Sequence, residues 1–420
     1  MAQAGSPTQF EFAFFLRAFN HRNYRLFFGG QAISLIGTWM QQVAMSWLVY
    51  RLTNSTFLLG VVGFTGQVPI FLFASLAGVF ADRHNRHRIL IVTQTLAMVQ
   101  ALTLAFLTLG GFITVWHIIV LSILLGLINA FDMPARQSFV IEIVEQREDL
   151  GNAIALNSFM FNGARLIGPS LAGILIALTG EGTCFLLNGI SFFTIILALL
   201  AMQVPLRKRG KGIEHFWKGL WEGYAYAFTI APIRSILLYL ALISFLVMPY
   251  SVLMPFFARD YLHGGPHTLG FLMAASGTGA LAGAVYLALR KTIRGLERII
   301  VVASVTFGLG LITFAFSRVL ALSLATLFFI GFGMIIQMAS CNTILQTIVQ
   351  EDMRGRVMSL FAVAMVGMAP FGSLFAGFLS SRIGPPHTLV ISGCICILGA
   401  LAFARQFLRM RGSQYGVSSL

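Results

Sequence analysis

The sequence predicts an all-α membrane protein in which twelve transmembrane helices form two six-helix bundles. The mean hydropathy of the 420 residues is +0.85. Only 10% of the residues are charged, whereas soluble globular domains carry about 25%. A water-facing surface cannot be built from this composition, so lipid is expected to be the main solvent. The number of apolar runs and a correspondence between the two halves of the chain supply the rest of the prediction.

Twelve apolar runs follow one another along the chain, each close to the length of about 20 residues that a bilayer-spanning helix needs. Helices are expected because a spanning segment must satisfy its backbone hydrogen bonds internally. Strands of a membrane β-barrel would alternate in polarity, and these runs are continuous. The predicted spans are 26–50, 57–81, 89–109, 113–131, 153–179, 183–203, 235–257, 268–289, 299–316, 319–340, 357–380 and 387–408.

The basic residues lie mainly between the spans and on one side of them. With the N-terminus placed in the cytoplasm, 23 of the 28 Lys and Arg residues fall in cytoplasmic segments, four fall on the opposite side, and Arg165 lies inside a span. Cytoplasmic loops of membrane proteins are enriched in Lys and Arg. We therefore expect both termini in the cytoplasm, and the net charge of +14 needs no nucleic-acid partner.

The longest polar connection, residues 204–234, separates the sixth span from the seventh. It begins with a basic cluster and continues with aromatic residues at helical spacing, among them Trp217, Trp221 and Tyr224. This pattern favours an amphipathic helix on the cytoplasmic membrane surface, and the alternative is a solvated linker. The predicted division is a cytoplasmic N-terminal segment at 1–25, an N-terminal six-helix bundle at 26–203, the linker at 204–234, a C-terminal six-helix bundle at 235–408 and a cytoplasmic tail at 409–420.

The two halves of the chain correspond in the positions of several glycines. The fifth and eleventh spans each carry three glycines, and one offset of 204 residues relates the two sets. The matched pairs are Gly163 with Gly367, Gly168 with Gly372, and Gly173 with Gly377. Early in each half, Gly60 matches Gly270. Two parallel six-helix repeats are an architecture of secondary transporters, in which the substrate is held near the bilayer midplane between the halves.

The turn between the second and third predicted spans reads GVFADRHNRHR, at residues 78–88. It resembles the loop signature G-x-x-x-D-R-x-G-R-R/K of the major facilitator superfamily, with Asn85 in place of a glycine; Asn is the other residue that tolerates a left-handed backbone. The resemblance implies a latch that holds the cytoplasmic ends of the bundles together in the outward-facing state. The alternative is that the arginines only set the topology. The predicted latch residues are Gly78, Asp82, Arg83, Arg86 and Arg88.

Longer segments are similar to the bacterial efflux branch of this superfamily, which includes the enterobactin exporter and macrolide efflux proteins. These segments are 129–173, 351–377 and the opening stretch that begins FNHRNYRLFFGG. The resemblance implies the major facilitator fold, a place in the bacterial inner membrane, and proton-coupled export of a hydrophobic or amphipathic small molecule such as a drug or a siderophore. We expect a monomer that is not an enzyme and that has no cofactor and no metal site.

Other functions stay open on the sequence alone. Relatives of the branch also move lipid between leaflets, so a lysophospholipid transporter is the main alternative. A membrane-embedded enzyme would need His and acidic residues at depth, and the spans hold only His117, close to a helix end. A receptor would need an appended soluble domain to pass on its signal. The sequence contains no nucleotide-binding signature, which disfavours an ATP-driven pump.

The fifth span contains Gly168-Pro169-x-x-Ala172-Gly173, which resembles the end of the antiporter signature of the superfamily. Proline removes a backbone hydrogen bond and kinks a helix, while small residues allow close helix contact. Gly168, Pro169 and Gly173 are therefore candidates for a functional helix kink, and simple helix packing is the alternative.

Polar side chains within the spans are expected to face the protein interior. Gln31, Ser34, Thr38 and Gln41 form one stripe on the first span, because spacings of three, four and three return to the same helix face. Hydrogen bonding between helices is the alternative to a substrate cavity. The candidate cavity residues are Gln31, Ser34, Thr38, Gln41, Asn162, Arg165 and Gln337.

Arg165 is the only formal charge well inside a predicted span, and such a residue is a functional candidate. It could bind an anionic group, or it could pair with Asp132 or Glu142. The resemblance to proton antiporters implies an acid within the membrane, and Asp132 at the end of the fourth span is the candidate for proton coupling. Asp132 could equally be a partner of the latch.

Overall fold

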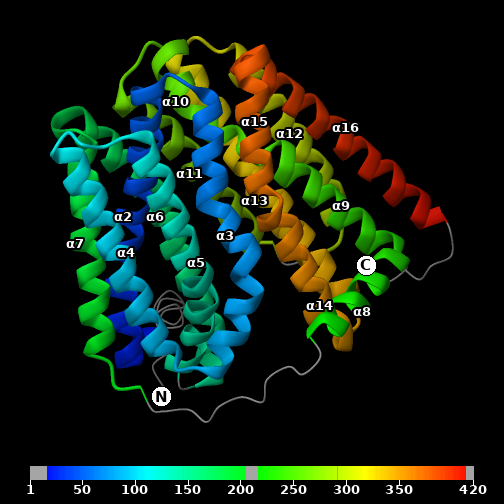
Figure 1. Cartoon of the computed structure of the whole chain (residues 1–420). Coiled ribbons are helices and arrows are strands. Elements are labelled where there is room, and N and C mark those ends of the chain that lie inside the picture. The colour runs from blue at the N-terminus through cyan, green and yellow to red at the C-terminus, as the bar shows by residue number, and fades with distance from the viewer. Residues whose placement is uncertain (1–16, 145, 205–215, 291, 413–420) are drawn as a thin grey trace, which may run out of the picture.

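The computed structural model describes residues 17–144, 146–204, 216–290 and 292–412. The regular structure in these ranges is helical, and its long helices pack as two bundles (Figure 1). Eleven helices of the described chain are long and apolar enough to cross a membrane. The remaining span is α2 (Arg22–Thr53), whose 32 residues suffice in length but include the polar stripe. The fold class predicted from the sequence is confirmed.

The N-terminal bundle contains the first six spans. Its bounds are η1 Arg17–Asn20, α2 Arg22–Thr53, α3 Thr56–Arg83, α4 Arg86–Leu109, α5 Val115–Ile143, η2 Arg147–Asp149, α6 Leu150–Thr179 and α7 Glu181–Leu200. α5 continues well past the predicted end of the fourth span at residue 131. A charged residue ends an apolar run without ending a helix, and Phe139, Val140 and Ile143 still bury themselves against the bundle.

α8 (Phe216–Thr229) connects the bundles in sequence and lies beside α9 and α14 in space (Figure 1). Glu222 of α8 pairs with Arg356 of α14 at 3.0 Å. The rings of Tyr224 and Phe228 stack with their centroids 4.2 Å apart. The helix lies where the sequence predicts an amphipathic one, while residues 205–215 of the predicted linker are outside the described part. Most of the predicted N-terminal segment and tail are outside it as well.

The C-terminal bundle contains the last six spans. Its bounds are α9 Ala231–Leu246, η3 Met248–Leu253, α10 Met254–Phe256, η4 Phe257–Tyr261, α11 Pro266–Ala288, α12 Leu296–Phe316, α13 Leu320–Ile348, α14 Glu351–Ala362, η5 Val363–Gly367, α15 Ala369–Ile383 and α16 Pro385–Gly412. Here η3 is a 3-10 helix, and η4 and η5 are short π-helices.

Two of these spans are interrupted, although the sequence predicts continuous runs. The seventh span changes from α9 to η3 at Pro249 and then passes through α10, which contains Pro255, into η4. The eleventh span passes through η5 shortly before Pro370. Proline removes a backbone donor and clashes with the preceding turn, so regular α-helix cannot continue through these positions. Single π-turns within helices are frequent at functional sites.

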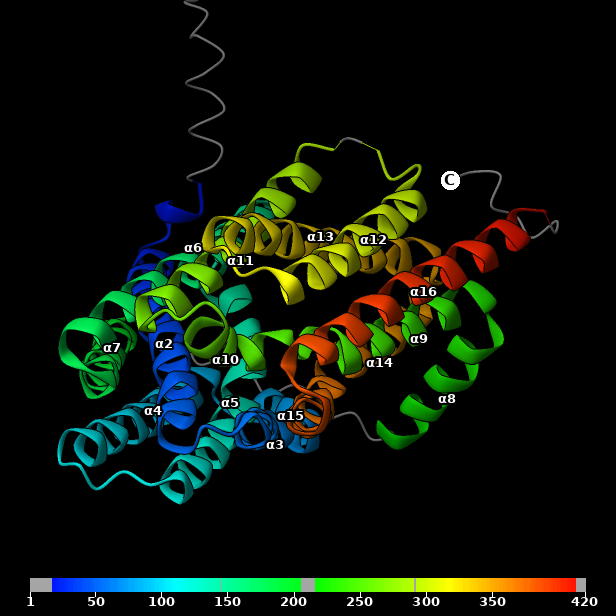
Figure 2. The same ribbon diagram turned by 90° about the horizontal axis from the view of Figure 1, so that it is seen from above.

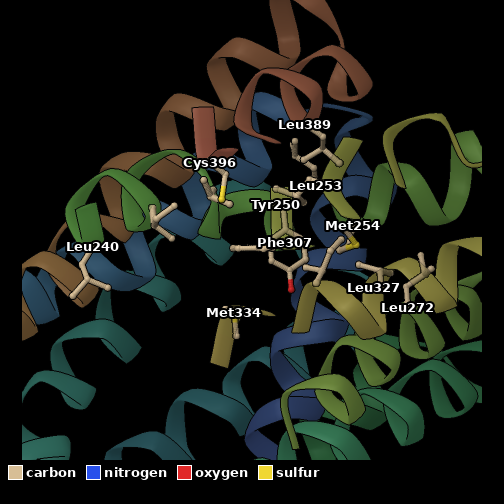
Figure 3. Packing of buried hydrophobic residues seen from close by; sticks show 14 of the residues in the cluster. Leu240, Tyr250, Leu253, Met254, Leu272, Phe307, Leu327, Met334, Leu389 and Cys396 are labelled. Atoms are coloured by element: carbon tan, nitrogen blue, oxygen red, sulfur yellow. The ribbon is translucent and has the colours of Figure 1, made fainter. Parts of the chain in front are cut away.

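The core of the C-terminal bundle is apolar and aromatic (Figure 3). The ring of Tyr250, on η3, meets the ring of Phe307 edge-on with the centroids 6.1 Å apart. The Tyr250 hydroxyl forms a hydrogen bond of 2.8 Å with the hydroxyl of Ser276 on α11. The interrupted seventh span is therefore fixed from two sides, by α11 and by α12.

The bundles lie side by side when they are seen from above (Figure 2). α3 packs against α15, and α6 packs against α11, so each bundle gives two helices to the shared face. α2 begins on one side of the molecule, the lower side in Figure 1, which we call the terminal end. The turns at 54–55 and 262–265 lie on the opposite side, which we call the far end.

Candidate functional site

Two glycine-to-glycine crossings hold the bundles together near the far end. α3 crosses α15 where Gly60 meets Gly377, and α6 crosses α11 where Gly173 meets Gly270. A Cβ on Gly60 would lie 2.8 Å from the Cα of Gly377, and one on Gly173 would lie 3.0 Å from the Cα of Gly270. These four residues are glycines that the two halves of the sequence share. The internal correspondence therefore appears in space as two equivalent crossings.

The same face of α3 is in open space toward the terminal end. Phe71 and Gly78 follow Gly60 by about three and five helical turns, so all three share one face. A Cβ on Gly367 would lie 2.8 Å from the ring of Phe71, so the bundles still touch at mid-depth. A Cβ on Gly78 would meet no heavy atom within 4 Å. Along this helix, the face between the bundles is closed at the far end and open at the terminal end.

Polar contacts also join the bundles at the far end. The hydroxyl of Tyr50, at the end of α2, donates to the carboxylate of Asp260 on η4. The guanidinium of Arg259 donates to the side-chain oxygen of Asn54 at 2.7 Å, and its Cζ lies 5.9 Å from the centre of the Tyr50 ring. This contact was not predicted from the sequence. The sequence feature that indicated it was the pair of adjacent charged residues Arg259 and Asp260, in a chain with few charges.

Asp260→Asn is expected to raise the population open at the far end about tenfold, because a hydrogen bond to a charged group contributes about 1.5–3 kcal/mol. Spin labels would be placed at positions 112 and 263, on the far-end turns of the two bundles. Double electron–electron resonance would then show a larger fraction of long distances between the two labels.

The matched control for this contact is Arg51→Gln. Arg51 pairs with Glu181 at 2.7 Å at the same end of the molecule, but within the N-terminal bundle. Its loss should leave the distance distribution unchanged. An equal shift in the two variants would show that the Asp260 contact does not hold the bundles together.

Arg165 lies at the middle of α6, on the side where α6 meets α2 and α11. Its Cζ is 5.8 Å from the centre of the Trp39 ring, and Trp39 in turn meets the ring of Phe161 edge-on at 5.7 Å. A Cβ on Gly277 of α11 would lie 3.1 Å from the carbonyl oxygen of Arg165, so the C-terminal bundle reaches this point of α6. Arg165 is therefore at the boundary of the two bundles, at mid-depth.

The alternative partners of Arg165 are both engaged elsewhere. Asp132 pairs with Arg136 at 2.8 Å, and Glu142 pairs with Arg86. Within the described ranges, no carboxylate lies at ion-pairing distance from Arg165. The ion pair of Arg165 with Asp132 or Glu142, which the sequence left open as an alternative, is not present in the structure.

The polar stripe of α2 is mostly inside the N-terminal bundle. Gln31, Ser34 and Gln41 are buried, and Thr38 donates to the carbonyl oxygen of Ser34 at 2.9 Å. Gln41 donates to Gln100 at 3.0 Å and accepts from Asn188 at 2.8 Å. Hydrogen bonding between α2, α4 and α7 accounts for Gln41 in this state, as the alternative interpretation expected. Thr38 is half-buried and directly precedes Trp39, the residue whose ring lies beside Arg165.

Two further cavity candidates differ sharply in their surroundings. Asn162 is half-buried, and its amide donates to the carbonyl oxygen of Ser158 one turn earlier on α6. Gln337 of α13 is 2% exposed, and neither its amide nitrogen nor its amide oxygen has a hydrogen-bond partner. Ser340, on the next turn, is also buried and unpaired. Within the described residues, no hydrogen bond joins Gln337 to Arg165.

Asp132 is buried in the N-terminal bundle with a complete set of partners. Its carboxylate accepts from Thr93 at 2.9 Å and from Gln94 at 2.7 Å, both on α4, and it pairs with Arg136 one turn later on α5. This network ties α4 to α5 at mid-bundle. It does not include the residues of the predicted latch.

The predicted latch forms ion pairs within one bundle. Arg86 pairs with Asp82 at 2.7 Å and with Glu142 of α5 at 2.5 Å, while Arg83 and Arg88 are exposed. Glu142 is the member of this cluster that was not predicted as part of the latch. The cluster joins α3, α4 and α5, and in this structure it makes no ion pair with the C-terminal bundle within the described residues.

Asn85 does not adopt the left-handed backbone that the comparison with glycine suggested. Its φ and ψ are −70° and 110°, and its side chain caps α4 by accepting a hydrogen bond from the backbone N–H of Arg88 at 3.1 Å. An asparagine is favoured here because it satisfies a free N–H group at the start of the helix.

The candidate kink residues lie in helix-to-helix contacts. A Cβ on Gly168 would lie 2.5 Å from the Cβ of Trp39 on α2. The carbonyl oxygen of Pro169 would lie 2.5 Å from a Cβ on Gly270, and Gly173 completes the crossing with α11. Close packing accounts for these residues in this state, and a role as a hinge stays a prediction.

Comparison with known proteins gives matches along almost the entire chain. The staphyloferrin A transporter of Staphylococcus aureus is 25% identical over 410 residues, which cover 94% of this chain and 100% of that protein. Macrolide efflux protein A of Streptococcus pyogenes is 23% identical and covers 91% and 96%. The multidrug efflux pump Tap of Mycobacterium tuberculosis is 27% identical and covers 87% and 89%.

Solved structures of transporters share the fold at low sequence identity. A mutant of the nucleoside transporter NupG superposes with a TM-score of 0.72 at 12% identity, over 92% of this chain and 99% of that one. A bacterial homologue of the human lysosomal transporter Spinster, in an inward-facing and occupied conformation, gives 0.69 at 14% identity, over 98% and 100%.

The transmembrane secretion effector model matches residues 15–419, so one family accounts for both bundles and for the face between them. The resemblance to the efflux branch is confirmed, and the relatives are transporters rather than enzymes. The chain belongs to the transmembrane secretion effector family of the major facilitator superfamily, and it is a multi-pass membrane transporter that acts on small molecules.

Proposed function

We propose that this protein exports a hydrophobic or amphipathic small molecule across the bacterial inner membrane by alternating access. The names of the relatives support export of this kind, since they include a siderophore transporter, a macrolide efflux protein and a multidrug efflux pump. The observation that carries the proposal is the unequal closure of one face of α3, which is tight at Gly60 and open at Gly78. A substrate would reach the space beside this face from the terminal end.

In this proposal the terminal end faces the cytoplasm, because most Lys and Arg residues lie in connections on that side. The structure then represents the state that accepts substrate from the cytoplasm. The outward-facing state requires the crossings at Gly60 and Gly173 to separate and the terminal ends of the bundles to meet. The latch residues Asp82 and Arg86 would gain partners from the C-terminal bundle in that state.

Coupling to protons is part of the proposal, with Asp132 as the acid that carries the proton. Asp132 is 2% exposed and lies within a span, where an ionisable side chain is a functional candidate. Protonation would weaken its pairing with Arg136 and loosen the contact between α4 and α5. A proton gradient that fails to drive transport by the purified protein would remove this part of the proposal.

Gly78→Leu tests alternating access directly. The position is open in this structure, so the leucine should neither disturb folding nor prevent substrate from binding in this state. In the outward-facing state the terminal ends would meet at this face of α3, and the leucine should hold them apart. We expect efflux from proteoliposomes to fall at least about tenfold, since overpacking a close contact costs about 1–3 kcal/mol.

Gly163→Leu is the matched control, because a Cβ at position 163 on α6 would also meet no heavy atom within 4 Å. It lies on a different face of its helix from the crossing residue Gly173, so efflux should be unchanged. Normal efflux by Gly78→Leu would contradict the proposed closure at the terminal end.

A further inference from the structure

We propose that the transported molecule is an amphipathic organic anion, whose charged group binds Arg165 and whose apolar part lies against Trp39 and Phe161. The inference rests on the proposed export function, and it names the chemical class of the substrate and the site that selects it. Three features of the described chain carry it: the depth of Arg165, the lack of an internal counter-ion, and the aromatic surfaces beside it.

Arg165 points away from lipid. From Ile167 onward, the exposed apolar side chains of α6 form one stripe at helical spacing, namely Ile167, Leu171, Ile174 and Leu178, and we take this stripe to face lipid. Nearer the terminal end, Ile154, Phe159 and Phe161 are exposed as well. At about 100° per residue, Arg165 points about 150° away from the mean direction of that stripe. It therefore faces the region between α2 and α11, where the two bundles meet.

The charge of Arg165 cannot reach water at the membrane surface. The residue is at the middle of a 30-residue helix, which places it near the centre of a hydrocarbon core about 30 Å thick, about 15 Å from either surface. An arginine can extend its side chain toward a nearby interface, but it is far shorter than this distance. A charge at this depth needs a partner or a water-filled space.

The chain supplies no acid for this purpose within its described residues. The acids that form ion pairs within the N-terminal bundle have other partners: Asp132 pairs with Arg136, Glu142 and Asp82 with Arg86, Glu181 with Arg51, and Asp149 with His21. Glu142 and Asp132 also lie on a different helix, α5, which ties them to α3 and α4. The site therefore carries a net positive charge in the described structure.

The aromatic neighbours suit an anion with an apolar body. The face of Trp39 is 5.8 Å from the Arg165 guanidinium, a cation–π contact that offsets only part of the cost of the buried charge. An arginine presents five N–H donors in a fork that fits a carboxylate or a phosphate. Its remaining donors are free for such a group, while Trp39 and Phe161 offer ring surfaces to the rest of the molecule.

A cationic substrate does not fit this site. It would meet the charge of Arg165 with no acid at hand to balance it, and like charges in a poorly solvated space repel each other strongly. The shared chemistry of the expected substrates is one anionic group on an apolar body. A soluble carboxylate and an anionic lysolipid both have it.

The test compares probes that share a ring system and differ in charge. Anthracene-9-carboxylate and 9-(aminomethyl)anthracene would be titrated against purified full-length protein by fluorescence anisotropy. We expect the carboxylate to bind at least tenfold more tightly than the amine. Arg165→Gln should weaken binding of the carboxylate at least tenfold without weakening binding of the amine, and Arg165→Lys should restore part of the loss.

Arg382→Gln is the matched control variant. Arg382 also lies over an aromatic ring, with its Cζ 5.6 Å from the centre of the Phe378 ring, but it is exposed at the far end. Its loss should leave binding of both probes unchanged. The inference would be overturned if the wild-type protein bound the amine more tightly than the carboxylate, a result that depends on no variant. It would also be overturned if Arg165→Gln bound the carboxylate as tightly as the wild-type protein does.

Transport of the same probes, and of fluorescent lysophosphatidylglycerol beside lysophosphatidylcholine, would then be measured in proteoliposomes. Movement of the soluble carboxylate identifies a soluble substrate, and movement restricted to lysophosphatidylglycerol identifies a lipid; either supports an anion-selective site if Arg165→Gln abolishes it. Arg165-dependent binding without movement of any probe would support the site and count against export. Movement of the amine and of lysophosphatidylcholine at equal rates would overturn anion selection while export stands.

Discussion

Gly60→Leu is expected to reduce transport by more than about tenfold, because overpacking in a close contact costs about 1–3 kcal/mol. A Cβ at position 60 would lie 2.5 Å from the carbonyl oxygen of Ser373 and 2.8 Å from the Cα of Gly377. Both are backbone atoms, which cannot rotate aside as a flexible side chain would. The leucine would hold α3 away from α15 and prevent the far end from closing. Efflux per amount of inserted protein measures the effect.

The same substitution at Gly29 is the control, since a Cβ there would meet no heavy atom within 4 Å. Gly29→Leu should transport normally. Spin labels on the far-end turns should show a longer separation between the bundles in Gly60→Leu and not in Gly29→Leu. If Gly60→Leu transported normally, the glycine crossings could not be the contacts that close the far end.

Asp132→Ala is expected to lower the free energy of unfolding by about 3 kcal/mol, because removing one partner of a buried ion pair leaves the other charge uncompensated. Arg136, with a side chain 23% exposed, would lose its counter-ion, and the donors of Thr93 and Gln94 would lose their acceptor. Reversible unfolding in mixed micelles, followed by circular dichroism, would measure the change.

Asp82→Ala provides the matched comparison, because Asp82 forms the same type of pair with an arginine one turn later. Its side chain is 53% exposed and the pair is 2.7 Å long, and exposed pairs contribute at most about 1 kcal/mol. A similar loss of stability in both variants would contradict the structural role of the Asp132 network. Asp132→Asn, which keeps an acceptor for Thr93 and Gln94, should be milder than Asp132→Ala.

The helices could be predicted because the bilayer imposes their length and their hydrogen bonding. The internal correspondence could also be read from the sequence, and its matched glycines at positions 60, 173, 270 and 377 mark the two crossings. A close helix crossing requires glycine, since any side chain there would clash with the backbone of the opposite helix, and this requirement is visible in the sequence.

The interruptions of the seventh and eleventh spans were not predicted, because hydropathy does not distinguish α-helix from π-helix. Pro249 and Pro255 carried the relevant signal for the seventh span. The contact between Tyr50 and Asp260 depends on how two bundles dock, with 210 residues between the partners. No periodicity along the chain encodes such a pairing.

The candidate site was predicted only in part, because part of it also depends on how the helices pack. A charge at mid-span is visible in sequence, and Arg165 was identified in this way. Whether a polar residue faces a cavity or a neighbouring helix depends on the rotation of its helix within the bundle. Gln41 and Gln31 share a stripe with Thr38, and a small change in that rotation decides which of them is buried among α4 and α7.

The glycine crossings lower the side-chain entropy that this transporter loses when its far end closes. A side chain that becomes fixed at an interface loses rotamer freedom at a cost of up to about 2 kcal/mol. Glycine has no such freedom to lose, so the Gly60–Gly377 and Gly173–Gly270 contacts can form and break without freezing any side chain at the point of closest approach. The balance between the closed and open states can then be set by a few polar contacts, such as that of Tyr50 with Asp260, and by the free energy of substrate binding.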